Sequence, residues 1–298
     1  MNSGNVGAMT NSSAVARVGV VGSGLMGSGI AEVSARAGID VLVAESSPEA
    51  AEAGQARITK SIGRANTSGK ISDAEADAAL GNITVTSDLT AMHDRQLVIE
   101  AIVEDENLKT DVFRQLDKIV TDSDAILASN TSSIPIMKLA MATARPENVI
   151  GIHFFNPVPV LHLVELVTSL HTSADTEARA QAFSTEQLHK RVIKSKDRAG
   201  FIVNALLIPY LLSAIRMFES GFASKEDIDD GMMTGCAHPM GPLALADLIG
   251  LDTTMAVAES LYDEFKEQLY APPPLLARMV EAGLLGRKAG RGFYDYAR

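Results

Sequence analysis

Short apolar runs alternate with longer amphipathic stretches through residues 15–196. The apolar runs, each bounded by Gly, Pro or polar residues, predict strands at residues 15–21, 40–44, 83–86, 96–103, 125–129, 149–155, 161–167 and 191–196. The stretches between them predict helices at residues 28–37, 48–66, 73–80, 108–120 and 174–189. Alternation of this kind is typical of an α/β fold, in which helices cover both faces of a doubly wound parallel sheet.

The pattern changes after residue 196, where only helices are predicted. Residues 201–220 are apolar on nearly all sides. The stretch without charge, between Arg198 and Arg216, is short for a membrane span, which needs about 20 residues, and it contains polar Asn204. Further helices are predicted at residues 225–234, 242–249, 253–268 and 274–282. A helix that is apolar all round is buried in a core or in a subunit interface, and we expect an interface, hence a homodimer. We therefore expect a disordered tail at residues 1–14, an α/β domain at 15–196 and an all-helical domain at 197–298.

The first predicted strand runs directly into the sequence GSGLMG at residues 22–27. Between a strand and a helix, this spacing lets Gly22 form a tight turn, Gly24 admit a pyrophosphate and Gly27 bring helix and strand close together. Glu45 ends the second predicted strand, where an acid hydrogen-bonds the adenosine ribose and repels a 2′-phosphate. These features predict a Rossmann-type domain that binds NAD. The alternative is a Gly-rich turn in another α/β protein.

Residues 149–167, VIGIHFFNPVPVLHLVELV, form two apolar runs around a Pro-rich turn. If the chain reverses symmetrically about Pro159, His153 lies directly opposite Glu165 on one face of the hairpin. A carboxylate held against an imidazole fixes its tautomer and stabilises the protonated ring, which suits a general base. The alternative is that His153 is an ordinary core histidine and that Glu165 lies on an exposed edge.

Polar side chains also follow two predicted strands at their carboxyl ends, where open α/β sheets bind ligands. Glu104 and Lys109 follow one strand and are placed for the nicotinamide half of the cofactor. The hydroxyl-rich sequence at residues 130–133 follows the next and suits hydrogen bonds to a substrate. Helix-start charges and N-caps are the alternatives.

Charge and cysteine content narrow the classes of function. The net charge of −11 argues against a nucleic-acid surface. The single cysteine, Cys236, excludes an intrachain disulfide, and with the lack of a signal-peptide pattern it fits a cytoplasmic protein. Basic residues nevertheless concentrate between Arg57 and Lys70, where either an anionic ligand or a solvated helix face would explain them.

Taken together, these segments resemble the 3-hydroxyacyl-CoA dehydrogenase family, from about Arg17 to the C-terminus. The similarity is greatest to short, stand-alone bacterial members that act on 3-hydroxybutyryl-CoA. The segments that carry it are GSGLMG, SNTSS, HFFNPVPVLHLVELV, DRAGFIVNALLIPYLLSAI, HPMGPLALADLIGLDT and GRKAGRGFYDY. Two departures are that DRAGF stands where many relatives have D-x-P-G-F and that Glu45 is more often Asp.

The resemblance implies an oxidoreductase that interconverts (S)-3-hydroxyacyl-CoA, in particular 3-hydroxybutyryl-CoA, and 3-oxoacyl-CoA, with NAD and alternatively NADP. It implies catalytic roles for His153, Glu165, Ser132 and Asn204. It implies cofactor contacts by Gly22, Gly24, Leu25, Met26, Gly27, Glu45, Glu104, Lys109, Ser132, Asn156 and Lys288. It implies contacts to CoA by Ser61, Lys70 and Ser132, and no metal.

Two other functions stay open at this point. One is a hydroxyacid or sugar-acid dehydrogenase of similar architecture, which would lack a CoA-binding patch. The other is a non-enzymatic NAD-binding or structural protein on the same fold, against which the His153–Glu165 pair argues.

Overall fold

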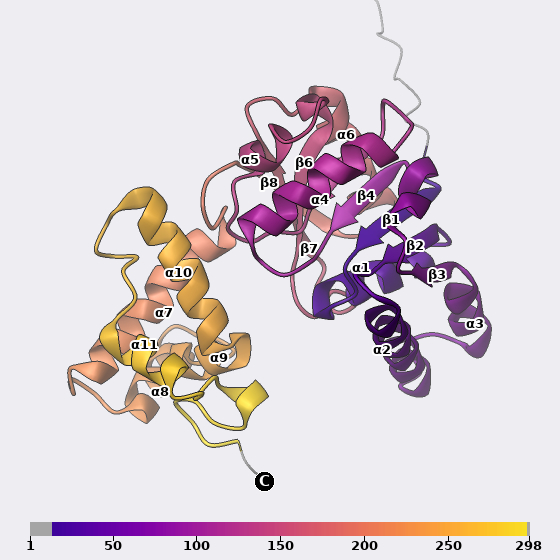
Figure 1. Ribbon diagram of the computed structural model, residues 1–298. Coiled ribbons are helices and arrows are strands. Elements are labelled where there is room, and N and C mark those ends of the chain that lie inside the picture. The colour runs from indigo at the N-terminus through magenta and orange to yellow at the C-terminus, as the bar shows by residue number, and fades with distance from the viewer. Residues whose placement is uncertain (1–13, 297–298) are drawn as a thin grey trace, which may run out of the picture. The chain divides into compact units, whose positions relative to one another are not determined.

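An eight-stranded sheet organises the first of two units in the computed structural model, which describes residues 14–296 (Figure 1). The strand order is β3-β2-β1-β4-β5-β6-β7-β8. The strands are β1 (Arg17–Val21), β2 (Asp40–Ala44), β3 (Ile83–Thr86), β4 (Leu97–Glu100), β5 (Ile126–Ser129), β6 (Val149–Phe154), β7 (Leu163–Thr168) and β8 (Arg191–Lys196). Neighbouring strands are parallel except β6 and β7, which form an antiparallel hairpin. The strand order reverses between β1 and β4, where ligands bind doubly wound sheets.

Helices cover both faces of this sheet. The helices of this unit are α1 (Leu25–Arg36), α2 (Pro48–Thr67), α3 (Asp73–Gly81), α4 (Glu106–Ile119), α5 (Ile136–Ala140) and α6 (Ala174–Ala182). Apolar residues of α1, α2, α3 and α6 share one core with alternate strand residues such as Val20 and Ile152. Gly151, which points the other way on β6, lies against Ile136 of α5. The α/β fold class that the pattern predicted is therefore confirmed.

The second unit is helical, as the sequence predicted. Its helices are α7 (Val203–Glu219), α8 (Lys225–Gly235), α9 (Pro242–Ile249), α10 (Leu251–Phe265) and α11 (Pro274–Glu281). The first unit comprises the described residues up to Thr131 together with 135–197, and the second comprises 132–134 and the residues from Arg198 onward. The predicted disordered tail lies, apart from Ala14, outside the described residues.

The apolar helix α7 supplies the core of its own unit. Leu211, Leu212 and Ile215 are fully buried and pack in one cluster with residues of α9, α10 and α11. Burial within one chain thus accounts for most of its apolar character. Leu206 is 71% exposed on the same helix, and the homodimer stays a prediction. Within residues 14–296, no helix is long and apolar enough to cross a membrane.

Two elements of the structure differ from the prediction. The helix expected at residues 174–189 is α-helical only to Ala182 and continues as a π-helical turn, Phe183–Gln187. The short helix α5 was not predicted, because five residues carry little periodic signal. Its first N–H groups, on Ile136 and Met137, donate to the carboxylate of Asp197, which lies far along the chain.

Candidate active site

The β6–β7 hairpin brings His153 and Glu165 together in the register that a symmetric reversal predicts. The two residues are direct partners in the ladder, and Nδ1 of His153 lies 2.7 Å from Oε2 of Glu165. Glu165 is fully buried and His153 is 6% exposed, so the alternative of an exposed edge for Glu165 is wrong. Because Glu165 engages Nδ1, a role of His153 as general base would use Nε2.

Neighbouring strands and rings hold this pair in place. The backbone N–H of Phe154, next to His153, donates to Oδ1 of Asn130 at the end of β5, over 2.9 Å. The ring of Phe155 lies 4.6 Å from the His153 ring, centroid to centroid, at a tilt of 53°. The acid–base pair therefore lies at the carboxyl end of β6, in line with the edge at which β1, β4 and β5 end.

The glycine-rich loop between β1 and α1 has the shape that a dinucleotide requires. Gly22 has a φ of 92°, which favours glycine. A Cβ on Gly27 would lie 1.8 Å from the carbonyl oxygen of Gly22, so only glycine lets the helix start here. A Cβ on Gly24 would meet nothing within 4 Å. The space in front of Gly24 and the N-terminus of α1 thus fits a pyrophosphate.

Glu45 turns back from the end of β2 onto this loop. Its Oε1 accepts hydrogen bonds from the hydroxyl of Ser23, at 2.6 Å, and from the Ser23 backbone N–H. Burial alone would raise the pKa of Glu45, but the hydrogen bonds from Ser23 and Ser46 and the charge of Arg57 outweigh burial and lower it. The carboxylate is thereby kept ionised beside the expected ribose. Sequence reasoning missed Ser23, whose only signal is its place between Gly22 and Gly24.

Lys109, near the start of α4, is buried between Glu100, the last residue of β4, and Glu104 in the loop that follows. Its Nζ is 2.7 Å from Oε1 of Glu100 and 3.1 Å from Oε2 of Glu104. Oε2 of Glu100 accepts a further hydrogen bond from the Ser129 hydroxyl at 2.6 Å, and the Thr131 hydroxyl donates to Glu104. Lys109 thus does lie near the start of a helix, and its charge is buried in an ion pair. Glu104, at 36% side-chain exposure, is the member of this cluster that reaches the surface.

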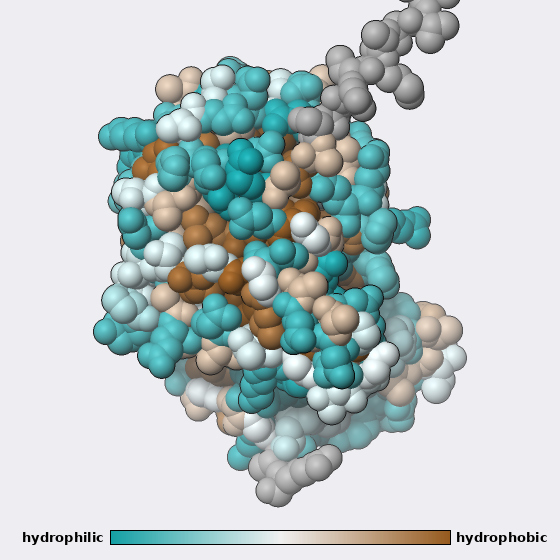
Figure 2. All heavy atoms as spheres, turned by 90° about the vertical axis from the view of Figure 1, so that its right-hand side faces the viewer, coloured by the Kyte–Doolittle hydropathy of each residue, from teal (hydrophilic) through white to brown (hydrophobic). Residues whose placement is uncertain are grey.

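The residues that the resemblance assigns to CoA lie on and after α2. Lys70 is exposed in the loop after α2, and Lys60 and Arg64 are exposed on the helix itself. Figure 2 shows the side of the molecule where α2 and α3 lie, with hydrophilic residues over much of that face. The Ser61 hydroxyl instead donates to Oε2 of the buried Glu32 on α1, at 2.6 Å. In this structure Ser61 therefore connects two helices.

Three further candidates belong to the second unit. Ser132 falls in the short segment that groups with it. Asn204 lies in the first turn of α7, and Lys288 forms an ion pair with Asp252, Nζ to Oδ2, at 2.6 Å. The roles of Ser132, Asn204 and Lys288 toward substrate and cofactor, and that of Asn156 in the hairpin turn, stay predictions.

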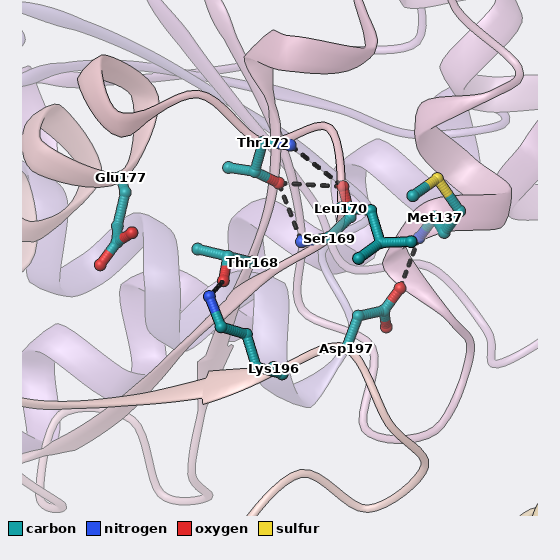
Figure 3. Close-up of a pocket in the computed structure, with 8 residues that line it drawn as sticks. All are labelled: Met137, Thr168, Ser169, Leu170, Thr172, Glu177, Lys196 and Asp197. Atoms are coloured by element: carbon teal, nitrogen blue, oxygen red, sulfur yellow. Dashed lines mark hydrogen bonds between the residues drawn. The ribbon is translucent and has the colours of Figure 1, made fainter.

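A separate cavity of about 400 Å³ opens in the first unit (Figure 3). It is lined by Met137, Thr168, Ser169, Leu170, Thr172, Glu177, Lys196 and Asp197. The Thr172 hydroxyl donates to the carbonyl of Val149, the first residue of β6, so the cavity lies near the opposite end of that strand from His153. At ~3.3 Å per strand residue, the two sites are roughly 13 Å apart. The cavity is therefore distinct from the acid–base pair.

Comparison with known proteins places both units in one family. Residues 17–198 match the NAD-binding domain of 3-hydroxyacyl-CoA dehydrogenase, and residues 200–296 match the C-terminal domain of the same family. A 3-hydroxybutyryl-CoA dehydrogenase of Mycobacterium tuberculosis is 60% identical over 96% of this chain and 100% of its own length. The human mitochondrial hydroxyacyl-coenzyme A dehydrogenase is 40% identical over 95% of this chain and 91% of its own length.

Solved structures agree with this match. The crystal structure of (S)-3-hydroxybutyryl-CoA dehydrogenase PaaH1 from Ralstonia eutropha is similar with a TM-score of 0.90 at 45% identity. The matched region covers 96% of this chain and 100% of that one.

Proposed function

Because this chain belongs to the 3-hydroxyacyl-CoA dehydrogenase family of NAD-binding oxidoreductases, we propose that it interconverts (S)-3-hydroxybutyryl-CoA and acetoacetyl-CoA. The observation that carries the proposal is the buried hydrogen bond of 2.7 Å between His153 and Glu165. It supplies an oriented general base at the sheet edge where the glycine-rich loop would hold the dinucleotide. The short acyl chain is supported by the substrate named for several of the relatives.

His153 carries the acid–base step of the proposed mechanism. In the oxidative direction its Nε2 accepts the proton of the substrate 3-hydroxyl group, and in the reductive direction it returns that proton. Glu165, behind the ring, stabilises the imidazolium that forms and holds Nδ1 protonated. Ser132 and Asn204 would hold the substrate oxygens. Bound NAD supplies the hydride-transfer chemistry, and the chain supplies placement.

We propose NAD rather than NADP as the preferred cofactor. Glu45 is ionised and held by Ser23 at the end of β2, where a 2′-phosphate would meet its negative charge. Leu25 and Met26, in the first turn of α1, lie beside the proposed pyrophosphate site. Glu104, in the loop after β4, and Lys109, near the start of α4, would support the nicotinamide half.

The CoA moiety would use the basic residues of α2. Lys70, Lys60 and Arg64 are exposed cations on and after one helix of an otherwise acidic protein, and phosphate groups are their natural ligands. A CoA contact by Ser61 would compete with its hydrogen bond to Glu32. We also propose a cytoplasmic location, because of the single cysteine and the lack of a signal-peptide pattern, and a homodimer, because of the apolar run at residues 201–220.

The test is oxidation of NADH with acetoacetyl-CoA as substrate. The loss of NADH absorbance measures the rate. Parallel assays replace NADH by NADPH and acetoacetyl-CoA by free acetoacetate. We expect rapid turnover with NADH and the thioester alone. Turnover with NADPH instead would contradict the role of Glu45. Equal turnover of free acetoacetate would contradict a CoA substrate, and no turnover with either cofactor would contradict the short acyl chain.

A further inference from the structure

The turn between β6 and β7 has one buried side and one exposed side. Val158 is 2% exposed and packs so closely on α1 that a Cβ on Gly29 would lie 2.8 Å from its Cβ. Asn156 is exposed, as are Val160 at 51% and Leu161 at 41%. The turn thus follows β6, the strand of His153, and packs on α1, the helix of the glycine-rich loop. Asn156 lies on the exposed side of the turn.

Lys190 is hydrogen-bonded to the backbone of this turn. Its side chain is buried at 7% exposure, and its Nζ donates to the carbonyl oxygens of Val158 and Leu161, each at 2.7 Å. The next backbone N–H, on Arg191, donates to the carbonyl of His162 at 2.7 Å. Three carbonyls of one turn are therefore held by two consecutive residues at the start of β8.

The partners of Lys190 are unusual for a buried cation. Within residues 14–296, no carboxylate lies within ion-pair distance of its Nζ, and the two carbonyls are its hydrogen-bond acceptors. Burial lowers the pKa of Lys190, and the charge of Arg36 acts in the same direction. Burying an ammonium group without a carboxylate partner costs free energy, and its hydrogen bonds to the protein offset part of that cost. The buried carbonyl of Val158 receives no other hydrogen bond from the described residues, and a buried backbone group requires one.

We propose that Lys190 is a positioning residue of the active site, which fixes the turn that carries Asn156 and joins His153 to the cofactor helix. The proposal rests on the proposed function for its assay. It assigns Lys190 no contact with substrate. It predicts that loss of the ammonium displaces the turn. NADH binding and turnover should therefore fall in a variant that still folds.

The experiment compares Lys190→Met, which keeps the apolar stem, with Lys190→Arg, which keeps donors for two carbonyls. Lys194→Met is the matched control, because Lys194 lies on β8 four residues further along, is 50% exposed and pairs at the surface with Glu177. The measurements are kcat and KM for NADH and acetoacetyl-CoA, NADH binding by nicotinamide fluorescence, and Tm. If Lys190→Met does not fold, Lys190→Gln takes its place, since its amide can serve one carbonyl.

We expect kcat/KM for NADH to fall about 10- to 100-fold in Lys190→Met, as displacement of positioning groups typically costs. Lys190→Arg should recover most of this loss, and Lys194→Met should match the parent. A folded Lys190→Met or Lys190→Gln with the parent's KM and kcat, and only a lower Tm, would overturn the proposal. If the parent itself does not turn over acetoacetyl-CoA, the proposed function fails, whereas the NADH titrations still decide the role of Lys190.

Discussion

Lys109 and Glu100 form an ion pair that is closed to solvent, with Nζ and Oε1 2.7 Å apart. Their side chains are 1% and 0% exposed, so water solvates neither charge, and Lys109 is the cation that pairs with Glu100. We expect Lys109→Met to lower the free energy of unfolding by about 3–5 kcal/mol, because it leaves a buried carboxylate unpaired. Urea unfolding measures this loss.

Two further variants make that measurement specific. Lys138→Met removes an exposed partner of Glu106 and should cost at most about 1 kcal/mol. Adding Glu100→Gln to Lys109→Met should restore part of the stability, because the amide is neutral. A double variant no more stable than Lys109→Met would show that the unpaired charge is not the cause.

Removing the proposed general base should abolish turnover without abolishing cofactor binding. We expect His153→Ala to lower kcat by at least about 100-fold, and Glu165→Gln to lower it by a smaller factor, because Gln keeps a polar partner for Nδ1. NADH affinity, measured by fluorescence, should stay near that of the parent. His171→Ala, an exposed histidine beyond β7, is the control. Parental kcat in a folded His153→Ala would sink the mechanism.

Gly24 offers a test of the proposed pyrophosphate site that should leave the fold intact. Since its Cβ would meet no atom of the chain within 4 Å, Gly24→Ala should keep the parent's Tm but bind NADH much more weakly. Gly63→Ala, also with open space around its Cβ but on α2, should bind NADH normally and be slightly more stable, by up to about 1 kcal/mol. Equal NADH affinity in Gly24→Ala and Gly63→Ala would contradict a pyrophosphate site at Gly24.

Glu45 should determine the choice of cofactor. Glu45→Gln removes the charge but keeps the shape, and we expect KM for NADH to rise about tenfold, the equivalent of one hydrogen bond to a charged group. In the same variant, KM for NADPH should fall relative to KM for NADH. Because the pKa of Glu45 is lowered from its ordinary value of 4.5, the parent's NADH affinity should be lost only below that pH. Glu49→Gln, an exposed carboxylate at the start of α2, is the control.

The C-terminal segment should make the protein sensitive to alkali. The Tyr294 hydroxyl donates to Oδ2 of Asp229 at 3.0 Å, and burial together with this carboxylate raises its pKa well above the ordinary value of 10.0. Above pH 10 the unfolded chain therefore loses this proton first, binds fewer protons than the folded chain, and gains relative stability. Tyr294→Phe should lose less of its free energy of unfolding between pH 10 and 11 than the parent. An unchanged slope would contradict this origin.

Much of the fold follows from patterns that lie within short segments. The strand and helix alternation, the glycine-rich turn and the His153–Glu165 register each depend on residues close together along the chain. The symmetric reversal about Pro159 needs only a Pro-rich turn and two apolar runs. For this reason the amino-acid sequence alone predicts both the pairing and the α/β class.

The partners of single side chains were decided by the tertiary structure. Ser61 donates to Glu32 of another helix, and Lys190 reaches carbonyls about thirty residues earlier in the chain. Helix α7 fills the core of its own unit instead of presenting all its apolar surface to a partner. A periodic pattern tells which face of an element is buried, but not which element covers it. Charged and polar side chains add a further reason, because burial is tolerable for them only where distant segments bring a hydrogen-bond partner.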